Sequence, residues 1–426
     1  DPSRLRGASG PAGRIGGGEP GSLVGVGCRI PRKDSMSLLR SARFPAIMLL
    51  VAAAAGLIIA NSPIGHSVQE LQHTYVGIPG VFELSVGHWI ADGLLALFFF
   101  VVAVELQFEL TNGQLNSARK ALQPAIAAAG GVIVPIAVYL AFAWGTESAD
   151  GWPIPTATDI AFALGVLAVF GKGLPSGVRI FLLALAILDD IVGIIFIAVL
   201  FTDGVNIALL AAAAVLVVIF GYLSRKLDTR ARAALIPILL LLAAGTWVLV
   251  YLSGVHATIA GVALGLAMAQ QPALHTRHAM EPWVNVIVLP LFAFSSALVI
   301  IPAVSIEELT PAFYGILIAL PVGKILGISL FGWISQRVAH DPAMPRLPLA
   351  DLIAAGALGG IGFTVSLLLS ELAFEGNDLL TDEAVLGVLS GSLISVIIAG
   401  ILVSTRARHY RRRASSVSDP SEAATS

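Results

Sequence analysis

The stretch LALAILDDIVGIIFIAVL at residues 183–200 places two adjacent carboxylates, Asp189 and Asp190, among otherwise uncharged residues. A helix needs about 20 mostly apolar residues to cross a lipid bilayer. A charge at the centre of such a helix costs roughly 2.5–3.5 kcal/mol on insertion scales, so it is rarely kept there without a function. The stretch therefore predicts a membrane-spanning helix that carries chemistry.

Apolar runs of similar length follow one another along the chain, which is 57% hydrophobic and only 12% charged. Soluble proteins carry about twice that charged fraction. A water-soluble all-α protein would need polar residues at helical spacing, and segments such as 236–250 have none. We therefore predict an all-α polytopic membrane protein with about twelve transmembrane helices. Their expected ranges are 44–60, 87–110, 122–143, 155–170, 178–201, 205–223, 234–252, 255–270, 283–301, 312–336, 350–374 and 384–405.

The distribution of Lys and Arg supports this topology, because the inner loops of membrane proteins are enriched in both. With twelve spans and the N terminus inside, every Lys and Arg except Lys324 falls at an inner position. We therefore expect both termini in the cytoplasm. The expected regions are a disordered N-terminal tail (1–43), a transmembrane domain (44–405) and a disordered, basic C-terminal tail (406–426). Met36 is a candidate natural start, so the first 35 residues need not be native.

One outer segment, residues 71–86, alternates polar and apolar residues around Gly-Ile-Pro-Gly. This pattern predicts a short exposed hairpin. An exposed strand edge can pair with the same edge of a second copy, so a homodimer through this hairpin is a hypothesis.

The adjacent pair Asp189 and Asp190 is the strongest functional signal. Neighbours on a helix point about 100° apart, so we expect two different roles for them. Carboxylate oxygens suit small, hard cations, and removal from water favours the protonated form of a carboxyl group. Such a group takes either a proton or a cation, which is the chemistry of ion exchange. The alternative is a structural pair held by Lys or Ser.

Lys324, in PVGKILGISLF, lies too deep in its span to reach either membrane surface easily. We expect a buried ion pair with an aspartate. Protonation of that aspartate would release the lysine, so the pair is a candidate switch.

Asp159 lies in PIPTATDIAFALG, where two prolines and Thr158 precede it. The short fourth span is thus a candidate interrupted helix. The eleventh span has a matching feature, since Gly359, Gly360 and Gly362 lie in GALGGIGFTVS and permit non-helical backbone. Interrupted spans in two corresponding halves point to a binding site near the midplane. Close helix packing is the alternative explanation of these glycines.

Three further polar residues lie in or beside spans, namely Asp92, Glu105 and His256. Asp92 and Glu105 either take part in function or form the polar lining of an inner or outer funnel. His256 is either a sensor of pH or a histidine held in place by hydrogen bonds.

Several strings resemble, in the same order, the NhaA-type sodium/proton antiporters over residues 44–405. They are VELQFEL, TATDIAFALGVLA, LALAILDDIVG, SGVHATIAGV, PWVNVIVLPLFAF, GKILGISLF and GGIGFTVS. Inverted repeats with discontinuous helices are known in transporters, and this family is one of the known examples. The resemblance implies such repeats in the third to fifth and tenth to twelfth helices, with the fourth and eleventh interrupted and crossing.

The resemblance also implies residue roles in a bacterial inner-membrane antiporter. Asp190 would be the main ligand of transported Na+ or Li+ and the proton carrier, and Asp189 its neighbour, paired with Lys324. Asp159, Thr158 and Lys324 would complete this cation- and proton-binding set. Asp159 and Thr158 would lie at the helix crossing, where Asp159 offsets helix N-termini and Lys324 offsets C-termini.

Two regions tied to the pH response differ from the family pattern. A basic pair commonly follows the acid that matches Glu105, and this chain has Gln107 and Phe108 instead. The inner loop before the ninth span is often rich in Glu and His, and here it reads TRHAMEPW with Arg277 and Glu281.

Other function classes are less favoured. A single cysteine excludes an internal disulfide framework, and the net charge of −2 does not suggest a nucleic-acid partner. No cofactor is expected, and the chain is not expected to be an enzyme. A sodium-coupled solute symporter would need a larger polar pocket. An intramembrane aspartyl protease with Asp159 and Asp189 as its dyad would usually show a Gly-x-Gly-Asp string, which neither residue has.

Overall fold

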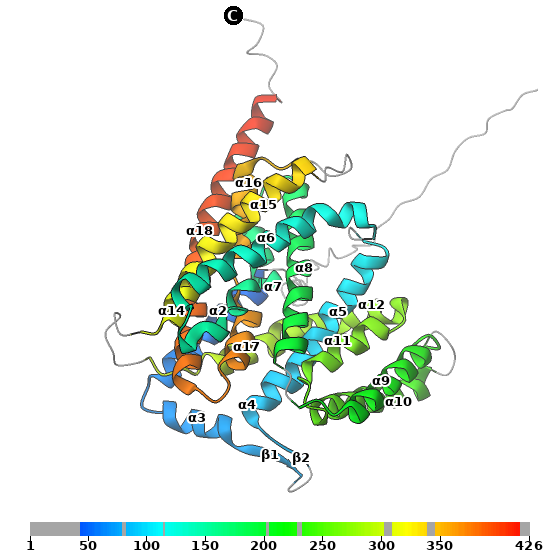
Figure 1. The fold of residues 1–426 in the computed structure, drawn as a ribbon. Coiled ribbons are helices and arrows are strands. Elements are labelled where there is room, and N and C mark those ends of the chain that lie inside the picture. Colours follow the sequence, from blue (N-terminus) through cyan, green and yellow to red (C-terminus); the bar gives the residue numbers. More distant parts are fainter. Residues whose placement is uncertain are drawn as a thin grey trace, which may run out of the picture.

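Apolar helices make up most of the computed structural model, which describes residues 43–78, 82–113, 116–201, 204–227, 232–301, 309–338 and 346–417 (Figure 1). Within these residues, eight helices are long and apolar enough to cross a membrane, or eleven if each of three bent pairs is one span. A shorter apolar helix, Thr258–Ala267, completes the set. Each predicted span contains one of these elements, so the polytopic all-α fold is confirmed.

The α-helices, in chain order, have the following bounds: α2 (Arg43–Ala60), α3 (Gly65–His73), α4 (Val86–His88), α5 (Leu95–Thr111), α6 (Ala118–Ala143), α7 (Ile160–Phe170), α8 (Ser176–Leu200), α9 (Ile207–Ser224), α10 (Arg232–Leu252), α11 (Thr258–Ala267), α12 (Gln270–Trp283), α13 (Leu289–Ser296), α14 (Pro311–Ile318), α15 (Lys324–Val338), α16 (Leu349–Gly359), α17 (Phe363–Ala373) and α18 (Asp378–Val417). Three π-helical turns join helices within one span: η1 (Trp89–Leu94), η4 (Val284–Val288) and η6 (Ala319–Gly323).

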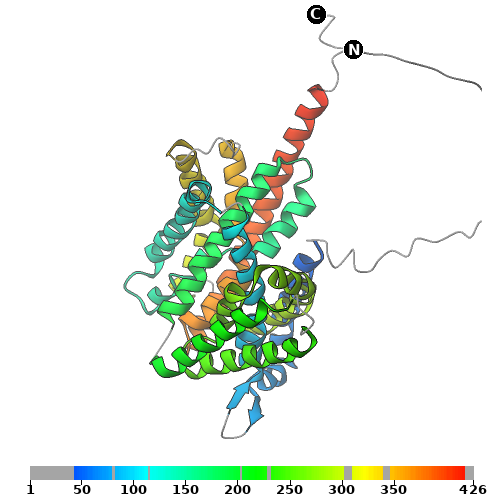
Figure 2. The same cartoon turned by 90° about the vertical axis from the view of Figure 1, so that its right-hand side faces the viewer.

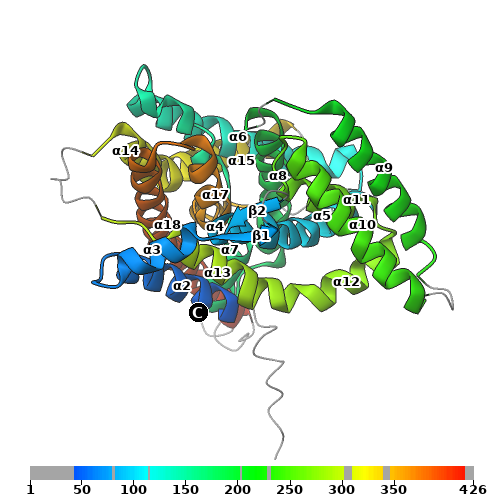
Figure 3. The ribbon, with the colours of Figure 1, turned by 90° about the horizontal axis from the view of Figure 1, so that it is seen from below.

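The two ends of the molecule differ. A short antiparallel hairpin, β1 (Tyr75–Ile78) with β2 (Phe82–Ser85), lies at one end, and α18 ends at the other (Figure 2). We call them the hairpin end and the C-terminal end. The predicted hairpin is therefore present, although its first three predicted residues, 71–73, belong to α3. Seen from below, the hairpin crosses the middle of the molecule, and α9 and α10 lie side by side at one edge (Figure 3).

Two expected boundaries are wrong. The chain from Arg406 is not a disordered tail, because α18 continues without a break to Val417. The segment around Arg277 is not a loop but helix α12, which continues through η4 into α13. The predicted N-terminal tail, apart from Arg43, and residues 418–426 lie outside the described residues.

The two predicted interrupted spans are both bent. Short 3-10 turns, η2 (Glu147–Gly151) and η3 (Ile154–Thr156), precede α7 at a bend of 49°, and α16 meets α17 at a bend of 50°. Each lies between two long helical spans, α6 and α8 in one case, and α14–α15 and α18 in the other. Corresponding members are seven positions apart in the order of the spans, with six spans between them, so the two sets run in opposite directions through the membrane. This is the inverted-repeat arrangement that the resemblance implied.

Small residues let the two sets approach closely. A Cβ added to Gly327 on α15 would lie 2.1 Å from the carbonyl oxygen of Gly130 on α6. Such backbone contact is the usual packing of membrane helices, which gain little from hydrophobic burial against one another. This contact fixes α15, whose first residue is Lys324, beside α6.

Candidate functional site

The breaks of the two bent spans meet in the interior. The backbone N–H of Asp159 donates to the carbonyl oxygen of Ile361 at 2.7 Å. The hydroxyl of Thr158 lies 2.8 Å from the carbonyl oxygen of Gly359. These bonds satisfy backbone groups that the helix breaks leave open, which is required where water is excluded.

Asp159 binds the N-termini of both α7 and α17. Its Oδ1 accepts from the N–H of Phe162 at 2.9 Å, and its Oδ2 accepts from the N–H of Thr364 at 3.3 Å and the Thr364 hydroxyl at 2.8 Å. Helix N-termini carry unpaired N–H groups and partial positive charge, so one carboxylate stabilises both. The expected location of Asp159 at the crossing is therefore present.

Lys324 binds the carbonyl end of a helical turn at the same crossing, whereas Asp159 binds helix N-termini. Its ammonium group donates to the carbonyl oxygen of Thr156, which ends η3, and lies 3.1 Å from the hydroxyl of Thr158. Its Nζ also lies 2.8 Å from Oδ2 of Asp189, and both side chains are fully buried. The predicted buried ion pair is thus present, and Asp189 is its acidic member.

Asp189 and Asp190 have different surroundings, as their positions on α8 require. Oδ2 of Asp189 faces Lys324 and accepts from Thr158 at 2.8 Å. Asp190 is also buried, with 6% of its surface exposed, but it is not part of this ion pair. Within the described part of the chain, Oδ1 of each aspartate is buried and has no hydrogen-bond partner.

Unpartnered buried oxygens of this kind are costly and call for an explanation such as an unseen ion or proton. Carboxylate and hydroxyl oxygens such as those of Asp189, Asp190 and Thr158 are the ligand type that hard cations prefer. No group of three or more His, Cys, Asp or Glu side chains that could hold a metal ion occurs among the described residues.

The predicted peripheral residues form two separate pairs away from the crossing. Near the hairpin end, Nδ1 of His256 lies 4.0 Å from Oδ1 of Asp92, which belongs to the π-helical turn η1. Glu105 lies in the C-terminal half of α5 and binds Arg277 of α12, with Oε2 and Nη2 3.0 Å apart. Both pairs are only partly buried, and neither includes a residue of the crossing.

The glycines of the eleventh span lie at the break between α16 and α17, where an interruption was predicted. None of Gly359, Gly360 and Gly362 has a positive φ. Instead, an added Cβ would lie 2.6 Å from Ile328 Cδ1 at Gly359 and 2.6 Å from the Leu320 carbonyl at Gly360. Close packing, the alternative left open above, explains them. The unusual backbone belongs to Phe363, the first residue of α17, with φ of 24°.

The sequence argument missed two acidic residues inside the eleventh span. Asp351 is fully buried in the first turn of α16, where its carboxylate binds Arg406 and Tyr410 of α18. Glu371, near the end of α17, lies beside Ser296 and within electrostatic range of Asp92. Both fall within the predicted range 350–374, so the test applied to other charges inside spans would have found them.

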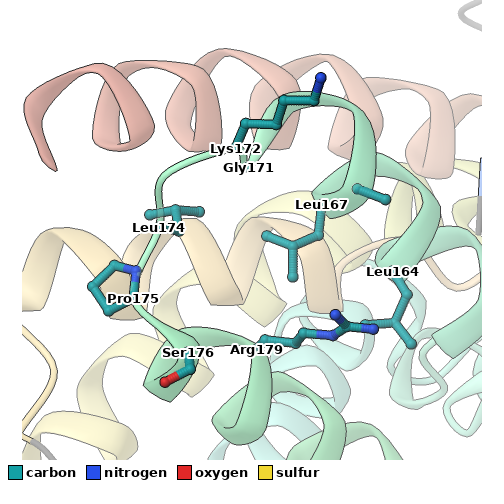
Figure 4. A pocket seen from close by; sticks show the side chains of 9 residues that line it. Leu164, Leu167, Gly171, Lys172, Leu174, Pro175, Ser176 and Arg179 are labelled. Carbon is teal, nitrogen blue, oxygen red and sulfur yellow. The ribbon is translucent and has the colours of Figure 1, made fainter. Parts of the chain in front are cut away.

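A cavity of about 370 Å³ lies at the turn between α7 and α8 (Figure 4). Its apolar wall includes Leu164 and Leu167, and Lys172 and Arg179 stand at its border. The predicted ion-binding residues do not line it. The crossing is therefore the candidate site, and this cavity is separate from it.

Comparison with known proteins agrees with the polytopic helical fold. Residues 36–403 match the family described as Na+/H+ antiporter 1. Similar proteins include a Na(+)/H(+) antiporter NhaA 2 of Clavibacter michiganensis subsp. michiganensis, 51% identical over 90% of this chain and 95% of the relative. The Na(+)/H(+) antiporter NhaA of Tropheryma whipplei is 46% identical over 89% and 97%, and that of Vibrio campbellii is 41% identical over 84% and 91%.

Proposed function

Since this chain belongs to the Na+/H+ antiporter 1 family and exchanges Na+ for protons across a membrane, we propose that Asp190 and Asp189 perform the exchange by alternating access. The observation that carries this proposal is the pair of unpartnered, buried Oδ1 atoms on adjacent aspartates beside the helix crossing. Na+, Li+ and H+ are the transported substrates in this proposal, and no cofactor takes part.

Asp190 is the main ion ligand and proton carrier. It lies outside the Lys324 ion pair, so its charge is not already compensated by that cation. A buried carboxylate in this position is stabilised either by a proton or by a bound cation, and the two compete for it. Deprotonation on the inner side therefore favours Na+ or Li+ binding, and protons arriving from outside displace the cation.

Asp189 and Lys324 act together as a switch. When Asp189 is ionised, Lys324 neutralises it across 2.8 Å. Protonation of Asp189, or a cation bound at its Oδ1, weakens that attraction. Lys324 then depends more on the Thr156 carbonyl and the Thr158 hydroxyl, both of which it already contacts. Because these two acceptors belong to the interrupted span, ion binding is coupled to its position.

Asp159 has a structural role at the crossing. Its carboxylate is fully used by the N-termini of α7 and α17, so we assign it a role in holding the two breaks together. Thr158 connects this crossing to the ion site, since its hydroxyl contacts both Gly359 and Asp189.

The exchange is electrogenic, with more protons than cations moved in each cycle. A membrane potential contributes about 2.3 kcal/mol per elementary charge per 100 mV to such a cycle. In proteoliposomes, imposing an inside-negative or inside-positive potential with valinomycin should change the initial rate of Na+-driven proton flux. A rate independent of the imposed potential would contradict electrogenic exchange.

The chain lies in the bacterial inner membrane with its C-terminal end in the cytoplasm. The basic residues of the last helical turns, Arg408 and Arg411 among them, support this orientation. The hairpin end then faces outward. There β1 is exposed along its whole length, which supports a homodimer through paired strand edges. Crosslinking at Tyr75 that yields only monomers would contradict this dimer.

The test of the ion site is Na+-driven proton flux in everted membrane vesicles, comparing the wild type with Asp190→Asn. Asparagine keeps the shape of the side chain but cannot carry the proton or the negative charge. We expect Na+-driven flux to disappear in this variant. Glu375→Gln, at an exposed carboxyl beyond the end of α17, is the matched control and should retain wild-type flux. Unchanged flux in Asp190→Asn would refute the assignment.

A further inference from the structure

Asp351 is a fully buried carboxylate with both of its oxygens bound to one neighbouring helix. Oδ1 accepts from Nε of Arg406 at 2.6 Å, and Oδ2 accepts from the hydroxyl of Tyr410 at 2.5 Å. Arg406 and Tyr410 are four residues apart on α18 and therefore lie on the same face. The guanidinium of Arg406 also lies 5.2 Å from the centre of the Tyr410 ring. These three side chains, which we call the Asp351 clamp, join α18 to the first turn of α16.

The same helix holds the other side of the break. The hydroxyl of Ser392 on α18 accepts from the backbone N–H of Phe363, the first residue of α17, at 3.2 Å. Residues 392 and 406 are about 21 Å apart along a helix at 1.5 Å per residue. α18 thus contacts the bent span at two distant points, one at the beginning of α16 and one at the beginning of α17.

The segment between these two points supplies the crossing. The carbonyl oxygens of Gly359 and Ile361 receive the Thr158 hydroxyl and the Asp159 N–H. A bent span can pivot at its break, and the bend here is 50°. If α16 shifts along α18, these carbonyls leave their partners, and Thr158 loses its position against Asp189.

A buried ion pair is weak evidence for a stabilising role, because its desolvation often cancels its attraction. Its better-attested use is to fix one arrangement among several. We propose that Asp351 is a positioning residue for ion exchange: the Asp351 clamp makes α16 and α18 move as one unit, which keeps the break in register with Thr158 and Asp159. This inference rests on the proposed ion site at Asp189 and Asp190.

The test measures the Na+ concentration for half-maximal exchange (KM) and the maximal rate of exchange. The rate is divided by the amount of folded protein, which is determined by size-exclusion chromatography. Asp351→Ala should raise KM by roughly 3- to 30-fold, the range expected for residues that act through packed neighbours. Tyr410→Phe, which removes one of the two contacts, should give a smaller increase. Arg408→Gln, at an exposed residue of the same helix, is the control and should leave KM unchanged.

A second variant separates positioning from stability. Asp351→Leu combined with Arg406→Met replaces the buried carboxylate and its partly buried partner by apolar groups and should give a protein with near wild-type thermal stability. We expect its KM to remain raised, because apolar contact does not fix the register of α16. Wild-type KM in both this variant and Asp351→Ala would overturn the inference, as would variants that differ from the wild type only in the amount of folded protein. In the same vesicles, absence of Na+-driven flux in the wild type, or its persistence in Asp190→Asn, would instead refute the proposed function.

Discussion

Replacing Lys324 by methionine removes the ammonium group that neutralises Asp189 in the membrane interior. The two side chains are fully buried and 2.8 Å apart, so a lone Asp189 carboxylate would have no water to solvate it. Removing one member of a buried pair costs about 3–5 kcal/mol. Methionine has a similar length and fills the space of the lysine stem, so the loss of packing is small by comparison.

The assay is thermal unfolding of purified protein in detergent. For Lys324→Met we expect a midpoint lower by about 6–10 °C, using about 2 °C per kcal/mol for a large domain. The double variant Asp189→Asn with Lys324→Met removes both charges. Replacement of a whole buried pair is often nearly neutral, so this variant should recover most of the lost stability while remaining inactive in Na+-driven proton flux.

Lys172→Met supplies the control, because Lys172 is an exposed lysine in the turn between α7 and α8. Its substitution should change the midpoint little, since surface changes are usually within about 0.5 kcal/mol. The reasoning fails if Lys324→Met is as stable as the wild type. It also fails if the double variant is no more stable than the single one, because the cost would then not come from an uncompensated Asp189 charge.

Three further substitutions test the surroundings of the site. Asp159→Ala removes the cap of two helix N-termini, each worth about 0.5–2 kcal/mol; thermal unfolding should show a loss of roughly 1–4 kcal/mol, and a loss below that of a single cap would contradict the shared role. Gly360→Ala places a Cβ 2.6 Å from the Leu320 carbonyl and should destabilise the protein and reduce exchange, whereas Gly400→Ala, whose nearest contact would be 3.6 Å from Phe170, should be tolerated; equal effects in the same two assays would contradict the packing argument. Arg277→Gln breaks the partly exposed pair with Glu105, and because such pairs contribute up to about 1 kcal/mol, KM for Na+ should change less than about fivefold; a larger change would show that this pair belongs to the ion site.

The membrane-spanning architecture was predictable because its cause is local. A run such as residues 234–252 is too apolar to be solvated by water. The loops that join such runs alternate between loops with Lys and Arg and loops without them. The interrupted spans were also predictable, since the prolines before Asp159 and the glycines near Gly360 interrupt helical sequence patterns. The sequence pattern did not show whether these glycines are needed for an irregular backbone or for close helix packing. That distinction depends on which atoms of Leu320 and Ile328 approach the glycines, and these atoms belong to the preceding span, whose packing the local pattern does not show.

The boundary errors have a common physical origin. Hydropathy locates the part of a helix inside lipid, but a helix ends only where its backbone hydrogen bonds end. The polar segment RARHYRRR from Arg406 was expected to be a tail for that reason. Arg406 and Tyr410 on α18 instead bind Asp351 on the neighbouring helix α16. These contacts keep α18 helical beyond the apolar run. The segment around Arg277 behaves similarly, because its partner Glu105 lies on α5.

The asymmetry of the two adjacent aspartates connects the cost of membrane charges to the proposed exchange. Asp189 is neutralised by Lys324 and held by Thr158, so its ionised form is stable in the absence of any transported ion. Asp190, outside that pair, has a buried oxygen without a protein partner in the described residues. Its ionised form without a bound cation is therefore the expensive state, so in the proposed exchange Asp190 carries either a proton or a cation. An exchanger needs this property, because a carrier site that is stable when empty would return across the membrane without its ion and dissipate the gradient.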